Sequence, residues 1–238
     1  YITKGNGALT GDVHITGTID QPQANGLVTV RNGSLSFKHV DNDLHDINAD
    51  ILFQGTQATL QGQADMGRGS VGFNGTVNWH GRQMTGYQGS LQLDQFEVKS
   101  DYTSGPITGE LYVTDIDGTP TLKGNINLEN NRFAIPLTME AGDSTIPLAL
   151  DVTVHAGKNV RLYDKFLYDM TIEGDVHFQG TTKWPTPSGQ FTVSSGSFKY
   201  LSNTFRISEG KATFRQGSYL PTLDLKAETT AGDYAINL

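Results

Sequence analysis

The 238-residue chain contains no cysteine, which excludes disulfides and any cysteine-based metal or redox site. Basic residues are few, with 17 Lys and Arg against 25 Asp and Glu and no basic stripe, so the balance argues against nucleic-acid binding. No run of about 18 apolar residues offers a transmembrane helix. No window has the i, i+3, i+4 spacing of an amphipathic helix, and 28 glycines disfavour long helices. These absences leave an all-β chain as the prediction.

A unit of strand-like sequence occurs three times without a gap, at residues 11–37, 109–135 and 174–200. In each copy a proline is followed by a glycine and then by a second glycine or an asparagine, always at the same offsets. These positions are Pro22, Gly26 and Gly33 in the first copy, Pro120, Gly124 and Asn131 in the second, and Pro185, Gly189 and Gly196 in the third. The uneven spacing between copies excludes a propeller or a short-period solenoid.

The last position of each repeat is predicted to have a left-handed backbone. Asparagine is the residue that best replaces glycine at such a site, so we expect positive φ at Gly33, Asn131 and Gly196. The unit then becomes strand, proline-marked turn, strand, tight turn, strand. The prediction is a sheet of many mostly antiparallel strands, in one segment over residues 1–238 that is a piece of a longer protein.

Apolar and polar residues alternate with period two along most of the chain, as in Leu148, Leu150 and Val152 against Ala149, Asp151 and Thr153. One face of the sheet is therefore apolar and the other polar. The candidates for the apolar face are Ile51, Phe53, Val71, Phe73, Val77, Leu111, Val113, Ile126, Leu128, Ile146, Leu148, Leu150, Val152, Val154, Met170, Ile172, Val176, Phe178, Leu223 and Leu225.

The function depends on what covers the apolar face, and there are three possibilities. In a closed β-sandwich or barrel the face packs on itself. In an outer-membrane barrel it faces lipid, but aromatic residues then gather in two girdles, whereas here they are scattered along the strands. In a long, curved, open sheet the face forms an apolar groove that acyl chains occupy, and the repeated units favour this elongated form.

The sequence resembles the C-terminal region of the TamB family, AsmA-like members of the bridge-like lipid transfer proteins. The resemblance covers most of the chain and is strongest from about Asn159 to Leu238. The resemblance is carried by Gly174, Gly180, Pro185, Gly189 and Gly196, by the ISEGKATF segment at residues 207–214, and by residues 221–225 before Ala227. It implies a periplasmic β-taco groove that conducts phospholipid toward the outer membrane, in a parent protein anchored in the inner membrane. It also implies an outer-membrane partner of the TamA/BamA type, as in the translocation and assembly module.

No motif for catalysis, a cofactor or a metal stands out. Histidines such as His14 and His177 fall on the polar face, where we expect solvent exposure rather than metal binding. Asp41, Asp43 and Asp46 are better explained by turn chemistry than by calcium. The two Ile-Pro-Leu triplets at Pro136 and Pro147 predict a bulged or interrupted hairpin, because proline cannot donate to a β-ladder.

The sequence therefore predicts a protein without enzymatic activity that transports phospholipid between the inner and outer membranes and supports outer-membrane homeostasis. The alternative is an interaction module that helps outer-membrane β-barrels to assemble by strand pairing at an exposed edge. The expected partners are acyl chains and a TamA/BamA-type protein, and no cofactor is expected.

Overall fold

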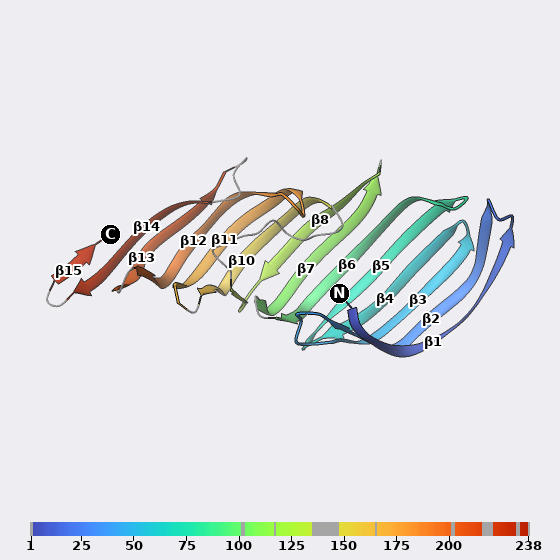
Figure 1. The fold of residues 1–238 in the computed structure, drawn as a ribbon, viewed down its shortest axis with the longest axis horizontal. Coiled ribbons are helices and arrows are strands. Elements are labelled where there is room, and N and C mark those ends of the chain that lie inside the picture. Colours follow the sequence, from blue (N-terminus) through green and yellow to red (C-terminus); the bar gives the residue numbers. More distant parts are fainter. Residues whose placement is uncertain are drawn as a thin grey trace. The chain divides into compact units, whose positions relative to one another are not determined.

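The computed structural model describes residues 2–100, 103–116, 118–134, 148–164, 166–200, 203–215, 221–231 and 234–237. Every element in these ranges is a β-strand, so the all-β prediction is confirmed (Figure 1). Within the described part of the chain, no helix is long and apolar enough to cross a membrane. The strands are β1 (Ile2–Gly17), β2 (Pro22–Phe37), β3 (Leu44–Gly55), β4 (Gln57–Met66), β5 (Gly69–His80), β6 (Gln83–Lys99), β7 (Thr103–Ile116), β8 (Thr119–Leu128), β9 (Arg132–Phe133), β10 (Ala149–Asp164), β11 (Tyr168–Thr181), β12 (Pro185–Tyr200), β13 (Asn203–Phe214), β14 (Thr222–Ala231) and β15 (Tyr234–Asn237).

The chain divides into two compact units. Unit 1 comprises residues 1–100 and 107–124, and unit 2 comprises residues 101–106 and 125–238, so β7 and β8 each contribute to both. In unit 1, β1 to β6 pair antiparallel in sequence order. In unit 2, β10 to β15 do the same, while β9 pairs in parallel with β10. Each unit is thus an antiparallel sheet in meander order, as predicted, rather than a sandwich of two sheets.

The period-two sequence pattern places directly paired residues on a common face. In unit 1, Val28 pairs with Ile51, and Ile51 pairs with Leu60. In unit 2, Val160 pairs with Ile172, and Ile172 pairs with Val193. Because side chains opposite each other in a ladder project to the same side, apolar residues collect on one face of each sheet.

The backbone geometry of the repeat differs from the prediction. Gly33, Asn131 and Gly196 do not have positive φ, and the predicted tight turn is absent because β2 and β12 continue through Gly33 and Gly196. Register shifts show that a β-bulge absorbs the extra residue there. In the first two copies the residue with positive φ is instead the one that precedes the predicted position. These residues are Asn32 (φ 49°) and Asn130 (φ 57°).

The repeat has a second glycine position, four residues after the proline, and there the backbone conformation requires glycine. Gly26, Gly124 and Gly189 have φ of 148°, 141° and 130°, a region that side-chain-bearing residues rarely adopt. A Cβ atom at these positions would lie 2.8 Å from Val13 Cα, 3.0 Å from Leu111 Cα and 3.1 Å from Val176 Cα, respectively, and closer still to a backbone carbonyl oxygen of the neighbouring strand. The repeat therefore preserves a close approach between two strands.

The prolines lie where strands begin. Pro22 and Pro185 are the first residues of β2 and β12, a position where a missing N–H costs no ladder hydrogen bond. The proline-marked turn of the repeat is therefore confirmed in these two copies. The predicted hairpin between Pro136 and Pro147 lies outside the described residues.

Candidate functional site

The apolar face of unit 2 runs without interruption over five strands. Its members project from paired positions of the ladder, with rows such as Val160, Ile172, Val193 and Leu225. The face consists of Leu150, Val152, Val154, Ala156, Val160 and Leu162 on β10; Met170, Ile172, Val176 and Phe178 on β11; Pro187, Phe191, Val193 and Phe198 on β12; Phe205, Ile207, Ala212 and Phe214 on β13; and Leu223, Leu225 and Ala227 on β14.

The centre of this face is closed to water, whereas its border is open. Val160 and Val176 are 0 % exposed and Ile172 is 4 % exposed, while Leu223 on β14 is 61 % exposed. Aromatic pairs fill the outer part: Phe198 stacks on Phe205 with ring centroids 5.3 Å apart, and Phe191 meets Phe214 edge to face at 6.0 Å. The side chains at the centre therefore contact one another and exclude solvent.

The apolar face of unit 1 is more accessible than that of unit 2. Leu60, Val77 and Leu91, on β4, β5 and β6, are 37 %, 38 % and 39 % exposed. On the edge strand β1, Leu9 and Ile15 are 71 % and 73 % exposed. The deeper positions of this face are buried and comprise Ala49, Ala64, Met66 and Val71. Unit 1 thus presents an apolar strip to its surroundings.

The predicted candidates fall into four groups. Val71, Leu128, Val152, Ile172 and Val176 are buried. Ile51, Phe53, Phe73, Leu111, Val113, Ile126, Leu148, Leu150, Val154, Met170, Phe178 and Leu225 are half-buried, and Val77 and Leu223 are exposed. Ile146 lies outside the described residues. In unit 1 the candidates on β3 and β5 lie on either side of β4, which pairs with both strands. In unit 2 the candidates on β10 and β11 pair directly, and β12 and β13 connect them to those on β14.

Several contributors to the face were missed by the sequence analysis, above all Phe198, Phe205 and Ile207. Phe205 and Ile207 are 5 % and 4 % exposed. Phe198 alternates correctly with Ser197 and Lys199 in the third repeat, so the period-two signal was present. The bulge near Ser194 shifts the phase of β12, and a pattern search that assumes one phase loses the strand at that point.

The opposite face of unit 2 is polar, and histidine and aspartate side chains contact each other on it. His155 Nδ1 lies 2.7 Å from Asp175 Oδ1, and His177 Nε2 lies 2.8 Å from Asp151 Oδ1. These contacts support the prediction that His177 lies on the polar face, where it is paired with a carboxylate. Half-exposed pairs of this kind contribute little to stability.

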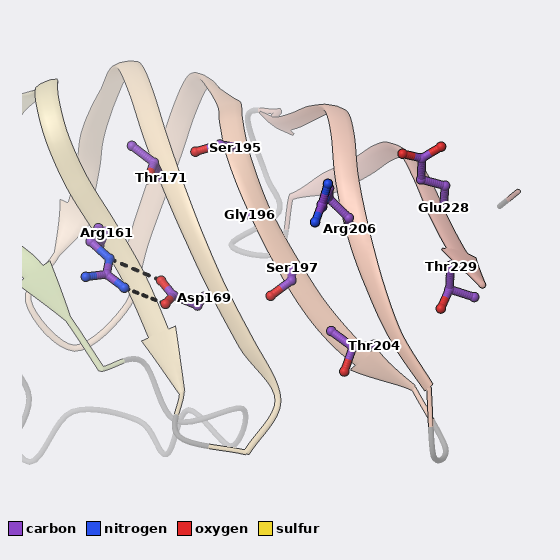
Figure 2. Close-up of a pocket in the computed structure, with 10 residues that line it drawn as sticks. All are labelled: Arg161, Asp169, Thr171, Ser195, Gly196, Ser197, Thr204, Arg206, Glu228 and Thr229. Atoms are coloured by element: carbon purple, nitrogen blue, oxygen red, sulfur yellow. Dashed lines mark hydrogen bonds and ion pairs between the residues drawn. The ribbon is translucent and has the colours of Figure 1, made fainter. Parts of the chain in front are cut away.

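A shallow polar hollow of about 780 Å³ lies on the same polar face (Figure 2). Figure 2 shows Arg161 donating to Asp169 at its border, with a distance of 3.1 Å from Nε to Oδ1. The remaining lining residues are Thr171, Ser195, Gly196, Ser197, Thr204, Arg206, Glu228 and Thr229. These ten residues include no histidine and no hydroxyl paired with a base, so the hollow presents no nucleophile arrangement.

In unit 1, ligand atoms of His45, Asp46 and Asp65 lie within 4.8 Å of one another. His45 Nδ1 is hydrogen-bonded to Asp46 Oδ2 at 2.8 Å, and the Asp46 side chain is 63 % exposed. The Asp46 carboxylate already binds one imidazole nitrogen of His45 at a bulge of β3, where Asp46 has φ of 52°. The turn predicted at Asp46 is therefore wrong, because β3 begins at Leu44 and continues through Asp46.

Comparison with known proteins adds one finding on family. Residues 135–235 match the family model described as the TamB C-terminal domain. This range covers β10 to β14, the strands that build the apolar face of unit 2. No solved structure matches the chain. The predicted resemblance to a TamB C-terminal region is therefore confirmed.

Proposed function

We propose that the chain carries phospholipid along its apolar face between the inner and outer membranes. The match of residues 135–235 to the TamB C-terminal domain supports this proposal and a role in the translocation and assembly module. The protein acts without catalysis and supports outer-membrane biogenesis. It works in the periplasm, within a parent protein anchored in the inner membrane.

The exposed apolar strip of unit 1 carries this proposal. Leu60, Val77 and Leu91 lie on three neighbouring strands and keep more than a third of their surface open. An apolar patch that a sheet leaves open is a place where another apolar surface binds. The residues paired with these three are aliphatic, aromatic or glycine.

The energetics favour sliding over tight binding. Each methylene buried contributes roughly 0.8 kcal/mol, so an acyl chain of about sixteen carbons gains on the order of 10 kcal/mol on such a surface. A row of similar Val, Ile, Leu and Phe side chains offers neighbouring positions of similar energy. In unit 2 an acyl chain gains most at half-buried positions such as Met170 and Phe178, because no water is left to displace at Val176.

Photo-crosslinking tests the proposal. A photoreactive side chain at Leu60 or Val77 should capture phospholipid, whereas the same group at Gln61 or Asn78 should not, since these neighbours project to the polar face. Native mass spectrometry of the purified chain should also detect bound phospholipid. Equal crosslinking on both faces, or a lipid-free protein, would contradict lipid transport.

The edge strand β1 supports a second candidate function. It pairs with β2 on one side, and all but one of its sixteen residues are exposed. A long edge with free backbone groups can accept a strand from another protein, which is how a TamA/BamA-type partner or a nascent β-barrel would bind. Under this alternative, a strand peptide would protect the amides of β1 from hydrogen exchange, and the purified chain would contain no phospholipid.

A further inference from the structure

One end of the unit 2 strands presents apolar side chains directly to solvent. Phe166 is 70 % exposed, Leu167 is 37 % exposed and Tyr200 is 60 % exposed. Phe166 and Leu167 lie between β10 and β11, and Tyr200 ends β12. We refer to these three residues as the aromatic rim.

Hydrogen bonds fix the backbone of the aromatic rim. Asp164 Oδ1 accepts from the backbone N–H groups of Phe166 and Leu167, at 2.8 and 3.0 Å. The backbone N–H of Lys199 donates to the Leu167 carbonyl oxygen at 2.7 Å, which ties the two ends of β11 and β12 together. These hydrogen bonds hold the backbone of Phe166 and Leu167 while both side chains stay exposed.

The aromatic rim is continuous with the apolar face of unit 2. Tyr168 pairs with Phe198, and Phe198 pairs with Phe205, so a row of three rings follows the rim. Further inward along β11, Met170 is half-buried and Ile172 is 4 % exposed. Apolar side chains therefore lead stepwise from water into the closed centre of the face.

We propose that the aromatic rim docks on the surface of a phospholipid bilayer and is the point where acyl chains pass between that bilayer and the apolar face. The proposal rests on the lipid-carrying function proposed above. Tyrosine and phenylalanine are residues that settle at the membrane interface, with rings among the upper acyl carbons and the tyrosine hydroxyl among head groups. Lys199 precedes Tyr200 in the sequence and is also exposed, so it adds a positive charge near the rim that attracts lipid phosphates.

The size of the aromatic rim favours a bilayer over a protein partner. Three side chains offer at most a few hundred Å² of contact surface, since a large aromatic residue buries roughly 150–250 Å² of its surface. A stable protein–protein interface needs about 800 Å² from each partner. Insertion of a few apolar side chains into a bilayer, in contrast, needs no complementary surface of fixed shape.

Vesicle flotation tests the proposal on the whole 238-residue chain. The probes are vesicles of phosphatidylethanolamine and phosphatidylglycerol, and the test variant is the double substitution Phe166→Ser and Tyr200→Ser. We expect vesicle binding to fall by about tenfold for each side chain removed. The matched control is Trp184→Ser, because Trp184 is 65 % exposed but lies in the turn between β11 and β12, at the opposite ends of those strands. The control should bind vesicles as the unmodified chain does.

Two further readouts separate the possible failures. Unchanged melting temperatures for both variants would confirm that exposed positions were altered without unfolding. The double variant should still bind a short-chain monomeric phospholipid on its apolar face, since that lipid needs no bilayer docking. If the monomeric lipid does not bind even to the unmodified chain, the lipid-carrying function is refuted. If the double variant floats as well as the control, only the docking proposal is refuted. A crosslinker at position 166 that captures a protein and no lipid would also overturn the docking proposal.

Discussion

Replacing Gly189 by alanine tests whether the repeated glycine shapes the sheet. Gly189 has φ of 130°, and a Cβ atom there would lie 3.1 Å from Val176 Cα and closer still to the Asp175 carbonyl oxygen. The unfavourable backbone region costs roughly 1–3 kcal/mol. The overlap with a paired strand forces a backbone shift that costs roughly another 1–3 kcal/mol. Gly189→Ala should therefore destabilise the protein by about 2–6 kcal/mol.

Thermal unfolding followed by circular dichroism measures this loss. For a chain of this size each kcal/mol lowers the melting temperature by about 2–4 °C, so we expect a decrease of about 5–20 °C. The matched control is Gly72→Ala on β5, where φ is ordinary and an added Cβ meets nothing within 4 Å. This control should be neutral or stabilise by about 0.4–1 kcal/mol. Equal melting temperatures for the two variants would refute the argument that the repeat preserves a close strand approach.

Three other measurements test packing and charge. Val176→Asp should lower the free energy of unfolding by several kcal/mol in urea titrations, because Val176 is fully buried, whereas Leu223→Asp at a 61 % exposed site should cost less than about 1 kcal/mol. Asp169→Asn should cost no more than about 1 kcal/mol in the same assay, because the Arg161–Asp169 pair is nearly half exposed on both sides. Burial and the nearby Asp164 carboxylate raise the pKa of Tyr168 above its usual value of 10.0. Its contribution to stability is therefore complete below about pH 10 and is lost as the pH rises through the folded-state pKa, and the Tyr168→Phe variant should lack this late step in an ultraviolet titration.

The strands and faces could be predicted from the sequence because alternation with period two is a direct consequence of strand geometry. Val152, Ile172 and Val176 were predicted on the apolar face, and all three are buried there. No knowledge of distant contacts was needed, since the two faces of a strand separate whatever its partner is.

The bulges could not be predicted in the same way. Asn32 and Gly33 form the Asn-Gly pair that marks a hairpin turn, yet β2 continues through them. A bulge and a tight hairpin turn can both place an asparagine at positive φ, as Asn32 is here, so the local Asn-Gly sequence does not distinguish them. The difference is decided by the next strand, because β3 pairs with both sides of the irregularity, with Ile47 opposite Gly33 and Leu44 opposite Leu35.

The degree of burial also depends on distant contacts. Leu60 in unit 1 and Val176 in unit 2 belong to the same kind of alternating strand, but they are 37 % and 0 % exposed. Sequence alternation assigns each side chain to a face and does not say what lies across from it. For this reason the accessible strip of unit 1 and the aromatic rim of unit 2 emerged only from the structure.

The repeated glycine lies opposite a position of the apolar face that is more buried than its surroundings. Gly189 is paired with Val176, which is 0 % exposed, so a close approach of two strands coincides with one of the deepest positions of the face in unit 2. The equivalent pair in unit 1 is Gly26 with Val13, at the half-buried position of an otherwise exposed edge strand. The repeat thus preserves backbone geometry beneath an apolar surface. A surface built in this way gives an acyl chain many similar positions and no single preferred one, which suits passage along the sheet better than capture at one site.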